Sequence, residues 1–332
     1  MSFEGMSAWR APKGVRLPDF IICGAMKCGT TTVHSLLNSH PRISVAEEEI
    51  HFYDIDDHLE HGDFVFLRKD AWAYPDVKKD PTSYWKWYSK FFEGFPEENL
   101  IGEDSTGYLP SEKALQRISI QDKPTKIIVC LRNPTSRAYS QYYHLLRSGR
   151  VLFNFEDTVL YTPDFVLRRS MYFEQVKRLL NFIPREQVFF FVLEEFIADA
   201  TKVTKTLMDF IGEPFDDLPA AWMDTHSNVG GIPRFPQLQV SMNRLLRRAV
   251  SNRYLNHLPI SDYAQIGEVA YKIDLGTRLV NRAHKMINPI IDAKPPKMKA
   301  NTRAYLDQYF KRELEGLDEL IGIPVVKKWF PE

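Results

Sequence analysis

The stretch that decides the fold is Phe20-Ile-Ile-Cys-Gly24-Ala-Met-Lys27-Cys-Gly29-Thr-Thr-Thr-Val33-His-Ser-Leu-Leu37. Its first four residues form an apolar run that predicts a buried strand, and the residues from Val33 to Leu37 begin a helical pattern. Between the two elements, Gly24 and Gly29 let the backbone approach a ligand closely. The N–H groups at the start of a helix attract an anion. The stretch therefore predicts a phosphate-binding site.

The loop resembles the Walker A loop of nucleotide-binding proteins, whose pattern is Gly-x-x-x-x-Gly-Lys-Ser/Thr. Gly24 and Gly29 have the required spacing, but Thr30 occupies the position of the lysine, and Lys27 lies inside the loop. The order from Lys27 to Thr31 is similar to the 5′-phosphosulfate loop of sulfotransferases that use 3′-phosphoadenylyl sulfate (PAPS). Taken alone, the stretch is also compatible with an ordinary strand–turn–helix that carries a surface lysine.

Composition excludes a strong overall electrostatic field. The 332 residues include 43 Lys and Arg and 43 Asp and Glu, so no net charge favours nucleic acid or an acidic membrane. Cys23, Cys28 and Cys130 have no zinc-site spacing and do not indicate a disulfide framework. Residues 1–18 lack the apolar core of a signal peptide, and no run approaches the ~20 apolar residues of a membrane span. We expect a soluble, cytoplasmic protein with a loose N-terminal arm over residues 1–18.

Strands and helices alternate along the chain. Further strands are predicted at 43–45, 126–131 and 187–193, and the stretch 100–109 is predicted to be a short strand that ends in a polar turn. This series indicates a parallel sheet with right-handed crossovers. Helices are predicted at about 84–92, 163–182, 201–211, 236–250, 262–287 and 301–321. We expect a single domain over residues 19–325, with an aromatic-rich insertion at about 55–98 and a mostly helical part from about 236. The insertion suits a substrate lid, although packing is the commoner use of aromatic residues.

Arg132 directly follows the predicted strand 126–131, at the edge where open α/β sheets bind ligands. Asn133 can cap the next helix, and Pro134 suits its first position. Ser140 lies about two turns into that helix. Arg132 could clamp a phosphate as a bidentate donor, with the Ser140 hydroxyl as a second donor. Pairing of Arg132 with a carboxylate is the alternative.

Glu49 and His51 lie two residues apart, so they point the same way in an extended segment. A carboxylate and an imidazole on one side of a loop could take a proton from an acceptor and orient it. The alternative is a solvated acidic turn, which is the better interpretation for Glu47 and Glu48.

The chain resembles PAPS-dependent sulfotransferases, and within them the branch that contains the heparan sulfate sulfotransferase domains and related soluble bacterial enzymes. The resemblance rests on the residues Lys27 to Thr31, Glu49 to Asp54, and Leu131 to Ser140, and weakly on 102–109. It implies a three-layer, P-loop-like α/β fold with a central parallel sheet flanked by helices.

The resemblance also implies roles for single residues. It assigns the 5′-phosphosulfate to Lys27 and to the amides of Cys28, Gly29, Thr30, Thr31 and Thr32. It assigns the 3′-phosphate to Arg132 and Ser140, an adenine-side contact to Tyr172, and a C-terminal basic contact to Lys299. Glu49 is expected to be the general base, assisted by His51, and Lys27 to stabilise the leaving group. The implied product is 3′-phosphoadenosine 5′-phosphate (PAP), and no metal is expected.

One departure from the family pattern concerns the acceptor. Glu48 stands where the branch usually has a lysine, which argues against a polyanionic saccharide. We expect a small-molecule acceptor, a specialised metabolite with a hydroxyl or an amine, and no nucleic-acid or membrane partner. The oligomeric state is left open.

Two other functions stay open. A nucleotide kinase or NTPase is disfavoured because the Gly-Lys-Ser/Thr ending is missing and because no acidic strand end is placed to hold Mg²⁺. A non-catalytic module that binds PAP or a nucleotide would have no use for a base at Glu49.

Overall fold

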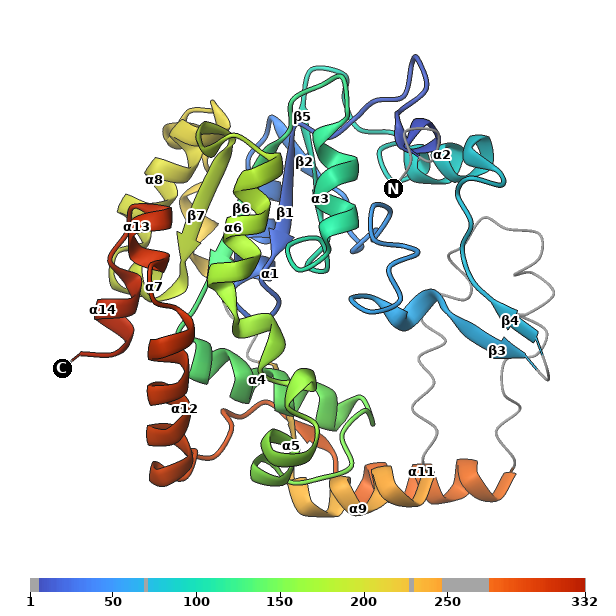
Figure 1. The fold of residues 1–332 in the computed structure, drawn as a ribbon, viewed down its shortest axis with the longest axis vertical. Helices are drawn as coiled ribbons and strands as arrows, with labels where there is room; N and C mark the ends of the chain where they lie inside the picture. Colours follow the sequence, from blue (N-terminus) through green and yellow to red (C-terminus); the bar gives the residue numbers. More distant parts are fainter. Residues whose placement is uncertain (1–5, 69–70, 227–229, 247–274, 332) are drawn as a thin grey trace. The chain divides into compact units, whose positions relative to one another are not determined.

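The computed structural model describes residues 6–68, 71–226, 230–246 and 275–331 (Figure 1). These residues form two compact units, each described by itself below. The first contains 6–132 and 174–226, and the second contains 133–173, 230–246 and 275–331. The single domain expected over 19–325 stays a prediction. Parts of two expected helices, 247–250 and 262–274, lie outside the described residues.

The first unit is built on a parallel sheet whose central strand is the predicted one, β1 (Phe20–Gly24). The strand order is β2-β5-β1-β6-β7, and every neighbouring pair is parallel. The other strands are β2 (Ile43–Val45), β5 (Leu100–Asp104), β6 (Lys126–Leu131) and β7 (Val188–Val192). All five residues of β1 are buried, because helices cover both faces of the sheet. The expected α/β fold with a central parallel sheet is confirmed.

The direction of each crossover connection determines which face of the sheet its helix covers. The chain passes from β1 to β2 in one direction across the sheet and from β5 through β6 to β7 in the other. Because such connections are right-handed, α1 (Thr30–Asn38) lies on the opposite face from α3 (Glu112–Ser119) and α6 (Tyr172–Phe182). Figure 1 shows α3 and α6 in front of the sheet. The crossover direction changes next to β1, and ligands bind at this point of an open sheet.

The remaining helices of the first unit are α2 (Pro81–Lys90), α7 (Leu193–Ala198) and α8 (Ala200–Ile211). The aromatic residues of α2 pack inward, and Tyr88 stacks on Phe52 with ring centroids 4.5 Å apart. In the sequence, a small antiparallel hairpin of β3 (Phe66–Arg68) and β4 (Ala71–Ala73) precedes α2. The aromatic residues on α2 therefore form core, and a lid function of the insertion stays a prediction.

The N-terminal segment is packed. Trp9 is 1% exposed, and the guanidinium of Arg117 lies 3.4 Å from its ring centroid. Gln121 donates a hydrogen bond to the Trp9 carbonyl. The expectation of a loose arm is therefore wrong for this part of the chain, because a cation and an apolar pocket hold the indole ring.

The second unit has its own apolar core, which includes Ala138, Leu146, Val166, Leu306 and Phe310. Its helices are α4 (Pro134–Arg147), α5 (Phe155–Tyr161), α9 (Pro236–Leu246), α11 (Leu275–Ile287), α12 (Ala300–Glu313), α13 (Leu317–Ile321) and α14 (Val325–Trp329). A short antiparallel pair joins β8 (Ile232–Pro233) to β9 (Ile290–Ile291). Asn133 caps α4 through its side chain and Pro134 follows, as predicted.

Two helix predictions are wrong in part. The helix expected over 163–182 is helical only from Tyr172, after two 3₁₀ turns. The guanidinium of Arg137 donates 2.6 Å hydrogen bonds to the Val166 carbonyl and to the Ser170 hydroxyl, and so holds this stretch out of a continuous helix. The helix expected over 301–321 breaks between α12 and α13, where Gly316 has a φ of +84°.

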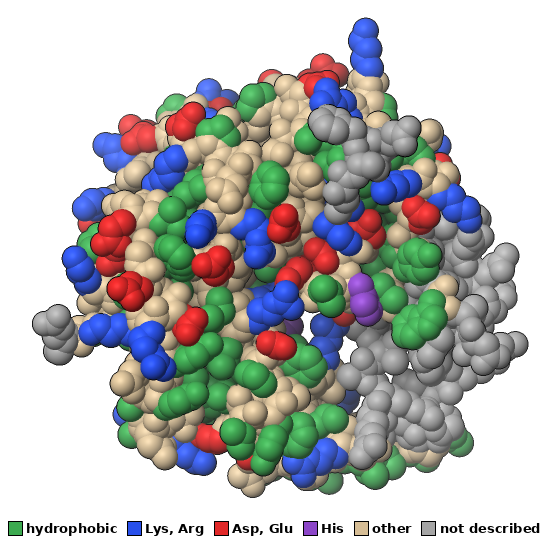
Figure 2. Space-filling view, in the orientation of Figure 1, with side chains coloured by type: hydrophobic (Ala, Val, Ile, Leu, Met, Phe, Trp, Pro, Cys, Tyr) green, Lys and Arg blue, Asp and Glu red, His purple; other side chains and the backbone are tan. Residues whose placement is uncertain are grey.

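Both signs of charge are mixed over the face drawn in Figure 2, in keeping with the balanced composition. Among the helices that the structure describes, none has the length and apolarity of a membrane span.

Candidate active site

The glycine loop follows β1 at the carboxyl edge of the sheet. A Cβ atom on Gly24 would lie 3.0 Å from the Leu109 Cβ and 3.1 Å from the Thr106 carbonyl oxygen, and the φ of Gly24 is +139°. Space and conformation both require glycine at this position. Lys27 and Gly29 also have positive φ values, of 69° and 94°. The loop is thus a tight, fixed turn between β1 and α1.

The start of α1 offers backbone donors to an anion. Gly29 is the N-cap residue, no side chain of the described residues caps the helix, and its first turn has no acidic residue. The first amides of a helix have no partner within the helix, so those of Thr30, Thr31 and Thr32 suit a phosphate. Cys28 and Thr30 are buried, which leaves mainly their backbone to a ligand. The loop therefore fits the 5′-phosphosulfate group expected there.

Arg132 lies beside this loop at the end of β6. Its Nη1 donates to the Lys27 carbonyl at 3.3 Å, and the Ala25 amide donates to the Cys130 carbonyl at 2.8 Å. These bonds join the ends of β1 and β6, so Arg132 is placed at the same edge as the predicted phosphate loop.

Three of the predicted cofactor residues belong to the second unit. Ser140 is half-buried on α4. Tyr172 is 0% exposed, and its ring centroid lies 6.0 Å from that of Trp329, which favours packing over contact with adenine. Lys299 is the N-cap residue of α12 and pairs with Glu156 at 3.3 Å. Their contribution to cofactor binding stays a prediction.

The predicted acid–base residues form a linear array in the first unit. The Nε2 atom of His51 lies 3.1 Å from the Glu49 Oε2, and its Nδ1 lies 3.2 Å from each carboxylate oxygen of Asp54. The side chains of His51 and Asp54 are buried, whereas that of Glu49 is 34% exposed. Only Glu49 therefore offers a carboxylate to an acceptor molecule.

The two carboxylates around His51 determine the protonation state of its imidazole. Carboxylate oxygens only accept hydrogen bonds, so an imidazole between two of them donates from both nitrogens and is an imidazolium. Burial alone lowers the pKa of His51, but Asp54 and Glu49 outweigh burial and raise it to about 10. Burial raises the pKa of Glu49, but its bonds to His51 and Thr106 lower it to about 2. Glu49 is therefore ionised at neutral pH.

A buried polar network holds His51 in place. The Ser105 hydroxyl accepts from the His51 amide at 3.0 Å and donates to Glu103, which also accepts from Tyr88 and Tyr108. His51 has a φ of 55°, which is rare for a non-glycine residue and is maintained by these contacts. Burial raises the pKa of Glu103 to about 7.

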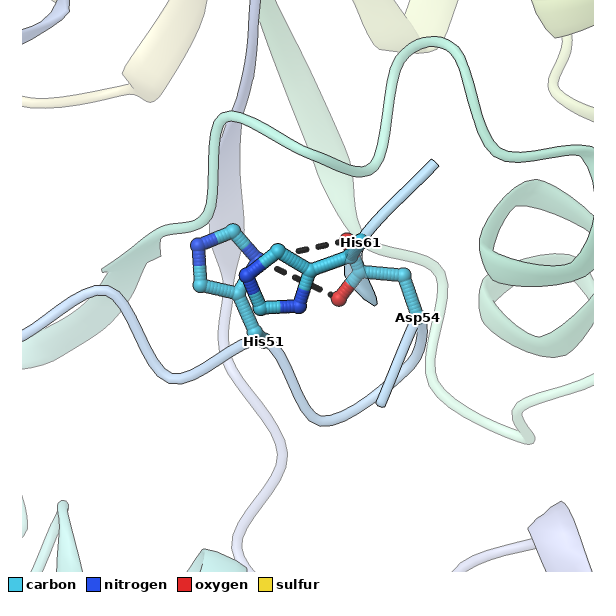
Figure 3. A group of neighbouring side chains, drawn as sticks. All are labelled: His51, Asp54 and His61. Atoms are coloured by element: carbon cyan, nitrogen blue, oxygen red, sulfur yellow. Dashed lines mark hydrogen bonds and ion pairs between the residues drawn. The ribbon is translucent and has the colours of Figure 1, made fainter. Parts of the chain in front are cut away.

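His61 stacks on His51 with ring centroids 3.9 Å apart, and with Asp54 these residues form the group in Figure 3. Their ligand atoms lie within 4.8 Å of one another. A metal ion lies close to the plane of each imidazole that binds it, and two rings only 16° from parallel cannot both satisfy this. The geometry favours a stacked pair that supports His51, and the expected absence of a metal stays a prediction.

One reason given above against a kinase is wrong. β5 pairs with β1 and ends in Glu103 and Asp104, so an acidic strand end does lie next to the glycine loop. Burial and the charge of Glu49 raise the pKa of Asp104 well above its usual value, and its Oδ1 has no hydrogen-bond partner among the described residues. Both effects favour the neutral form of Asp104 at this edge of the sheet. The missing Gly-Lys-Ser/Thr ending still separates this loop from a Walker A loop.

Sequence reasoning did not single out Asp54, Ser105 or Thr106. Asp54 lies three residues after His51, a spacing that could have paired them. Ser105 and Thr106 lie in the turn after β5, and no local pattern connects them to the segment 49–54.

The chain has a P-loop-like α/β fold, and Thr106 contacts both the Glu49 carboxylate and Gly24 of the glycine loop. The sulfotransferase domain family matches residues 17–270, and the chain belongs to this family.

Individual proteins with similar sequences are also sulfotransferases. The chain is 27% identical over 183 residues to the mouse heparan sulfate glucosamine 3-O-sulfotransferase 5. The aligned segment covers 52% of this chain and 46% of the relative. It is 30% identical over 130 residues to the membrane-associated sulfotransferase kil1 of Dictyostelium discoideum. This alignment covers 38% of this chain and 23% of that protein. The chain thus spans less than half the length of these curated relatives.

A solved structure shows the same fold. The sulfotransferase from Alicyclobacillus acidocaldarius aligns with a TM-score of 0.59 and 23% identity, over 95% of this chain and 99% of that one.

Proposed function

We propose that the chain is a sulfotransferase that moves a sulfuryl group from PAPS to a hydroxyl or amine of a small-molecule acceptor, with Glu49 as general base. One residue carries the proposal. The Thr106 carbonyl packs against Gly24 of the phosphate loop, and the Thr106 hydroxyl donates to the Glu49 Oε2 at 2.8 Å. The carboxylate is thereby fixed next to the loop that fits the phosphosulfate.

The donor site combines the loop with Arg132. PAPS supplies an activated sulfuryl group whose leaving group is a phosphate. Lys27 and the first amides of α1 stabilise the negative charge that develops on that phosphate, typically by several kcal/mol for such groups. Arg132, and by resemblance Ser140, bind the 3′-phosphate that distinguishes PAPS from ATP. The 3.3 Å bond from Arg132 to the Lys27 carbonyl couples these two groups of contacts.

Glu49 takes the proton of the acceptor as its oxygen or nitrogen attacks sulfur in line with the leaving phosphate. A carboxylate with a pKa of about 2 is a weak base toward a free hydroxyl. The hydroxyl becomes much more acidic as its bond to sulfur forms, so a positioned weak base accepts the proton late in the step. Such a base contributes ~10²–10⁴-fold in rate. His51 and Asp54 position Glu49 and do not touch the acceptor.

The acceptor side carries two further exposed carboxylates, Glu47 and Glu48. They disfavour a sulfated polysaccharide and favour a neutral or cationic small molecule, such as a specialised metabolite. A glycan acceptor is the second candidate, because the mouse relative is named for heparan sulfate glucosamine. A cytoplasmic location stays part of the proposal.

The first experiment is thermal stabilisation of the purified protein by PAP, ADP and ATP with Mg²⁺. We expect PAP alone to raise the melting temperature, by the mass-action effect of a ligand that binds only the folded state. Transfer from ³⁵S-labelled PAPS to a library of hydroxyl and amine acceptors then tests the reaction. Stabilisation by ATP with Mg²⁺ but not by PAP would favour the kinase alternative. PAP binding without transfer, even with Glu49 intact, would favour a non-catalytic binding module.

A further inference from the structure

The second unit has a surface on which exposed apolar side chains and cations lie together. It is formed by α9, α11 and the strands β8 and β9, and we call it the α9–α11 surface. The two helices run antiparallel, because Gln239 contacts His284 at 2.9 Å and Phe235 contacts Asn288 at 2.6 Å. Figure 1 draws both helices along the lower edge.

The apolar residues of α11 face away from α9. His284 and Asn288 contact α9, whereas Leu275, Leu279 and Met286 lie on another side of the helix and are 72%, 59% and 79% exposed. Ile287 beside them is 60% exposed, and Leu245 on α9 is 70% exposed. A surface helix of a globular protein normally has the opposite arrangement, with its apolar face toward the core. So many large exposed apolar residues together mark an interaction surface.

Cations predominate in the described stretches that form this surface, and the exposed Asp292 is the described carboxylate that lies nearest to them in the sequence. Arg278, Arg282 and Lys285 are exposed at helical spacing on α11, and Arg234 and Arg244 are exposed on the α9 side. Residues 230–246 and 275–291 contain no Asp or Glu. This surface is therefore a local basic patch, although the chain as a whole has no net charge. Along the lower edge of Figure 2, basic side chains lie among hydrophobic ones.

We propose that the α9–α11 surface binds the face of a lipid bilayer that contains anionic lipids. A basic helix with one apolar face lies in the plane of a membrane, with its apolar side chains among the acyl chains and its cations at the headgroups. Lys and Arg residues close to a membrane surface are attracted by the negative surface potential of anionic lipids.

A second copy of the chain suits this surface less well. A twofold interface brings the same patch of both copies together, so the five cations of one copy would lie near the five of the other, with no Asp or Glu within the described stretches 230–246 and 275–291 to pair them. An anionic membrane satisfies the apolar and the basic side chains at once. This binding does not require a membrane span, and it is an alternative to the expectation of no membrane partner.

The test is co-sedimentation of the full chain with phosphatidylcholine vesicles that contain phosphatidylserine, and with pure phosphatidylcholine vesicles. We expect binding only to the former, weakened by added salt. The triple variant Arg278→Glu/Arg282→Glu/Lys285→Glu should weaken it by about tenfold or more. The uncharged variant Leu279→Ser/Met286→Ser should also weaken it by about tenfold or more. Circular dichroism melts of each variant verify that these exposed positions leave the fold intact.

Matched controls come from elsewhere on the chain. Lys311→Glu/Arg312→Glu/Lys327→Glu makes the same charge change at exposed positions of the second unit, and Leu160→Ser/Ile197→Ser removes apolar side chains that are 68% and 75% exposed. Both controls should bind vesicles within about twofold of the parent, since the membrane field acts only within a Debye length. The proposal is overturned if the parent does not bind the anionic vesicles, or if the controls lose binding as the surface variants do. It is also overturned if light scattering shows a dimer that Leu279→Ser/Met286→Ser converts to a monomer.

Discussion

The Thr106 hydroxyl donates a 2.8 Å hydrogen bond to the Glu49 Oε2, the same oxygen that accepts from His51 Nε2 at 3.1 Å. Thr106 is 2% exposed and its carbonyl packs on Gly24, so a buried residue after β5 connects the phosphate loop to the carboxylate. In the proposed reaction this bond fixes the distance between base and donor.

Replacement of Thr106 tests that connection. Thr106→Val keeps the shape of the side chain but removes the hydroxyl donor, so Glu49 loses one of its two side-chain partners. We expect kcat to fall by about tenfold, as for one misplaced catalytic hydrogen bond, while the affinity for PAP stays within about twofold. Thr106→Ser, which retains the hydroxyl, should recover most of kcat. Equal activity of the valine variant and the parent would show that this bond does not position the base.

Glu49→Gln tests the base itself. The amide cannot accept the acceptor proton, and we expect kcat to fall ~10²–10⁴-fold. Because Glu49 is not among the residues proposed to bind the donor, PAP titration by calorimetry should give an affinity within a few-fold of the parent. Unchanged turnover would remove Glu49 from the mechanism, and lost PAP binding would place it in the donor site instead.

Arg132→Ala tests the assignment of the 3′-phosphate. The loss of a charge-assisted contact should weaken PAP binding by ~1.5–3 kcal/mol. Binding of ADP, which lacks the 3′-phosphate, should change much less, so the variant should bind the two ligands with similar affinity. If the parent protein already bound ADP and PAP equally, the 3′-phosphate assignment would be wrong.

His51 makes stability depend on pH at the alkaline side. Its folded-state pKa is about 10, above the usual 6.5, so the stabilisation is complete below pH 6.5 and is lost as pH rises through about 10. Between these limits the free energy of unfolding should fall on the order of a few kcal/mol. Urea unfolding from pH 7 to pH 10 measures this slope. His51→Asn, which does not titrate, should have a smaller slope, and parallel curves for the two proteins would contradict the buried imidazolium.

Gly107 tests the packing around the array. A Cβ atom there would lie 2.2 Å from the Asp54 Oδ2 and 3.1 Å from the His51 ring. Gly107→Ala should therefore destabilise the protein by ~1–3 kcal/mol through overpacking, and should lower kcat because the array must shift. Gly62→Ala is the control, since its nearest neighbour would lie at 3.5 Å, an ordinary contact. Similar melting temperatures for the two variants would refute this account.

The fold could be predicted from sequence where the signal was local. The apolar runs at 20–23 and 126–131 became the adjacent strands β1 and β6, and Asn133 with Pro134 began α4. The helix expected from 163 failed because Arg137, about thirty residues away in sequence, takes the Val166 carbonyl. Helical periodicity contains no information about such a distant donor.

The site shows the same division. Lys27, Glu49, His51 and Arg132 could be predicted as site residues because each lies in a short motif, and their roles stay predictions. Thr106 and Ser105 bind Glu49 and His51 from the turn after β5. The strand order β2-β5-β1 brings this turn to the segment 49–54. Asp104 was overlooked as an acidic strand end, since its position next to β1 depends on the same order.

The protonation of the buried acids has a consequence for the approach of the donor. Read as a sequence, the edge that contains Glu49, Asp54, Glu103 and Asp104 looks strongly negative, and a polyphosphorylated molecule would be repelled from it. Burial favours the neutral form of Asp104 and raises the pKa of Glu103 to about 7, and the imidazolium of His51 offsets Asp54. The negative charge at this edge is therefore smaller than its four carboxyl groups suggest. In the proposed reaction an anionic donor can therefore approach this edge, while the partly exposed Glu49 keeps its charge for the acceptor.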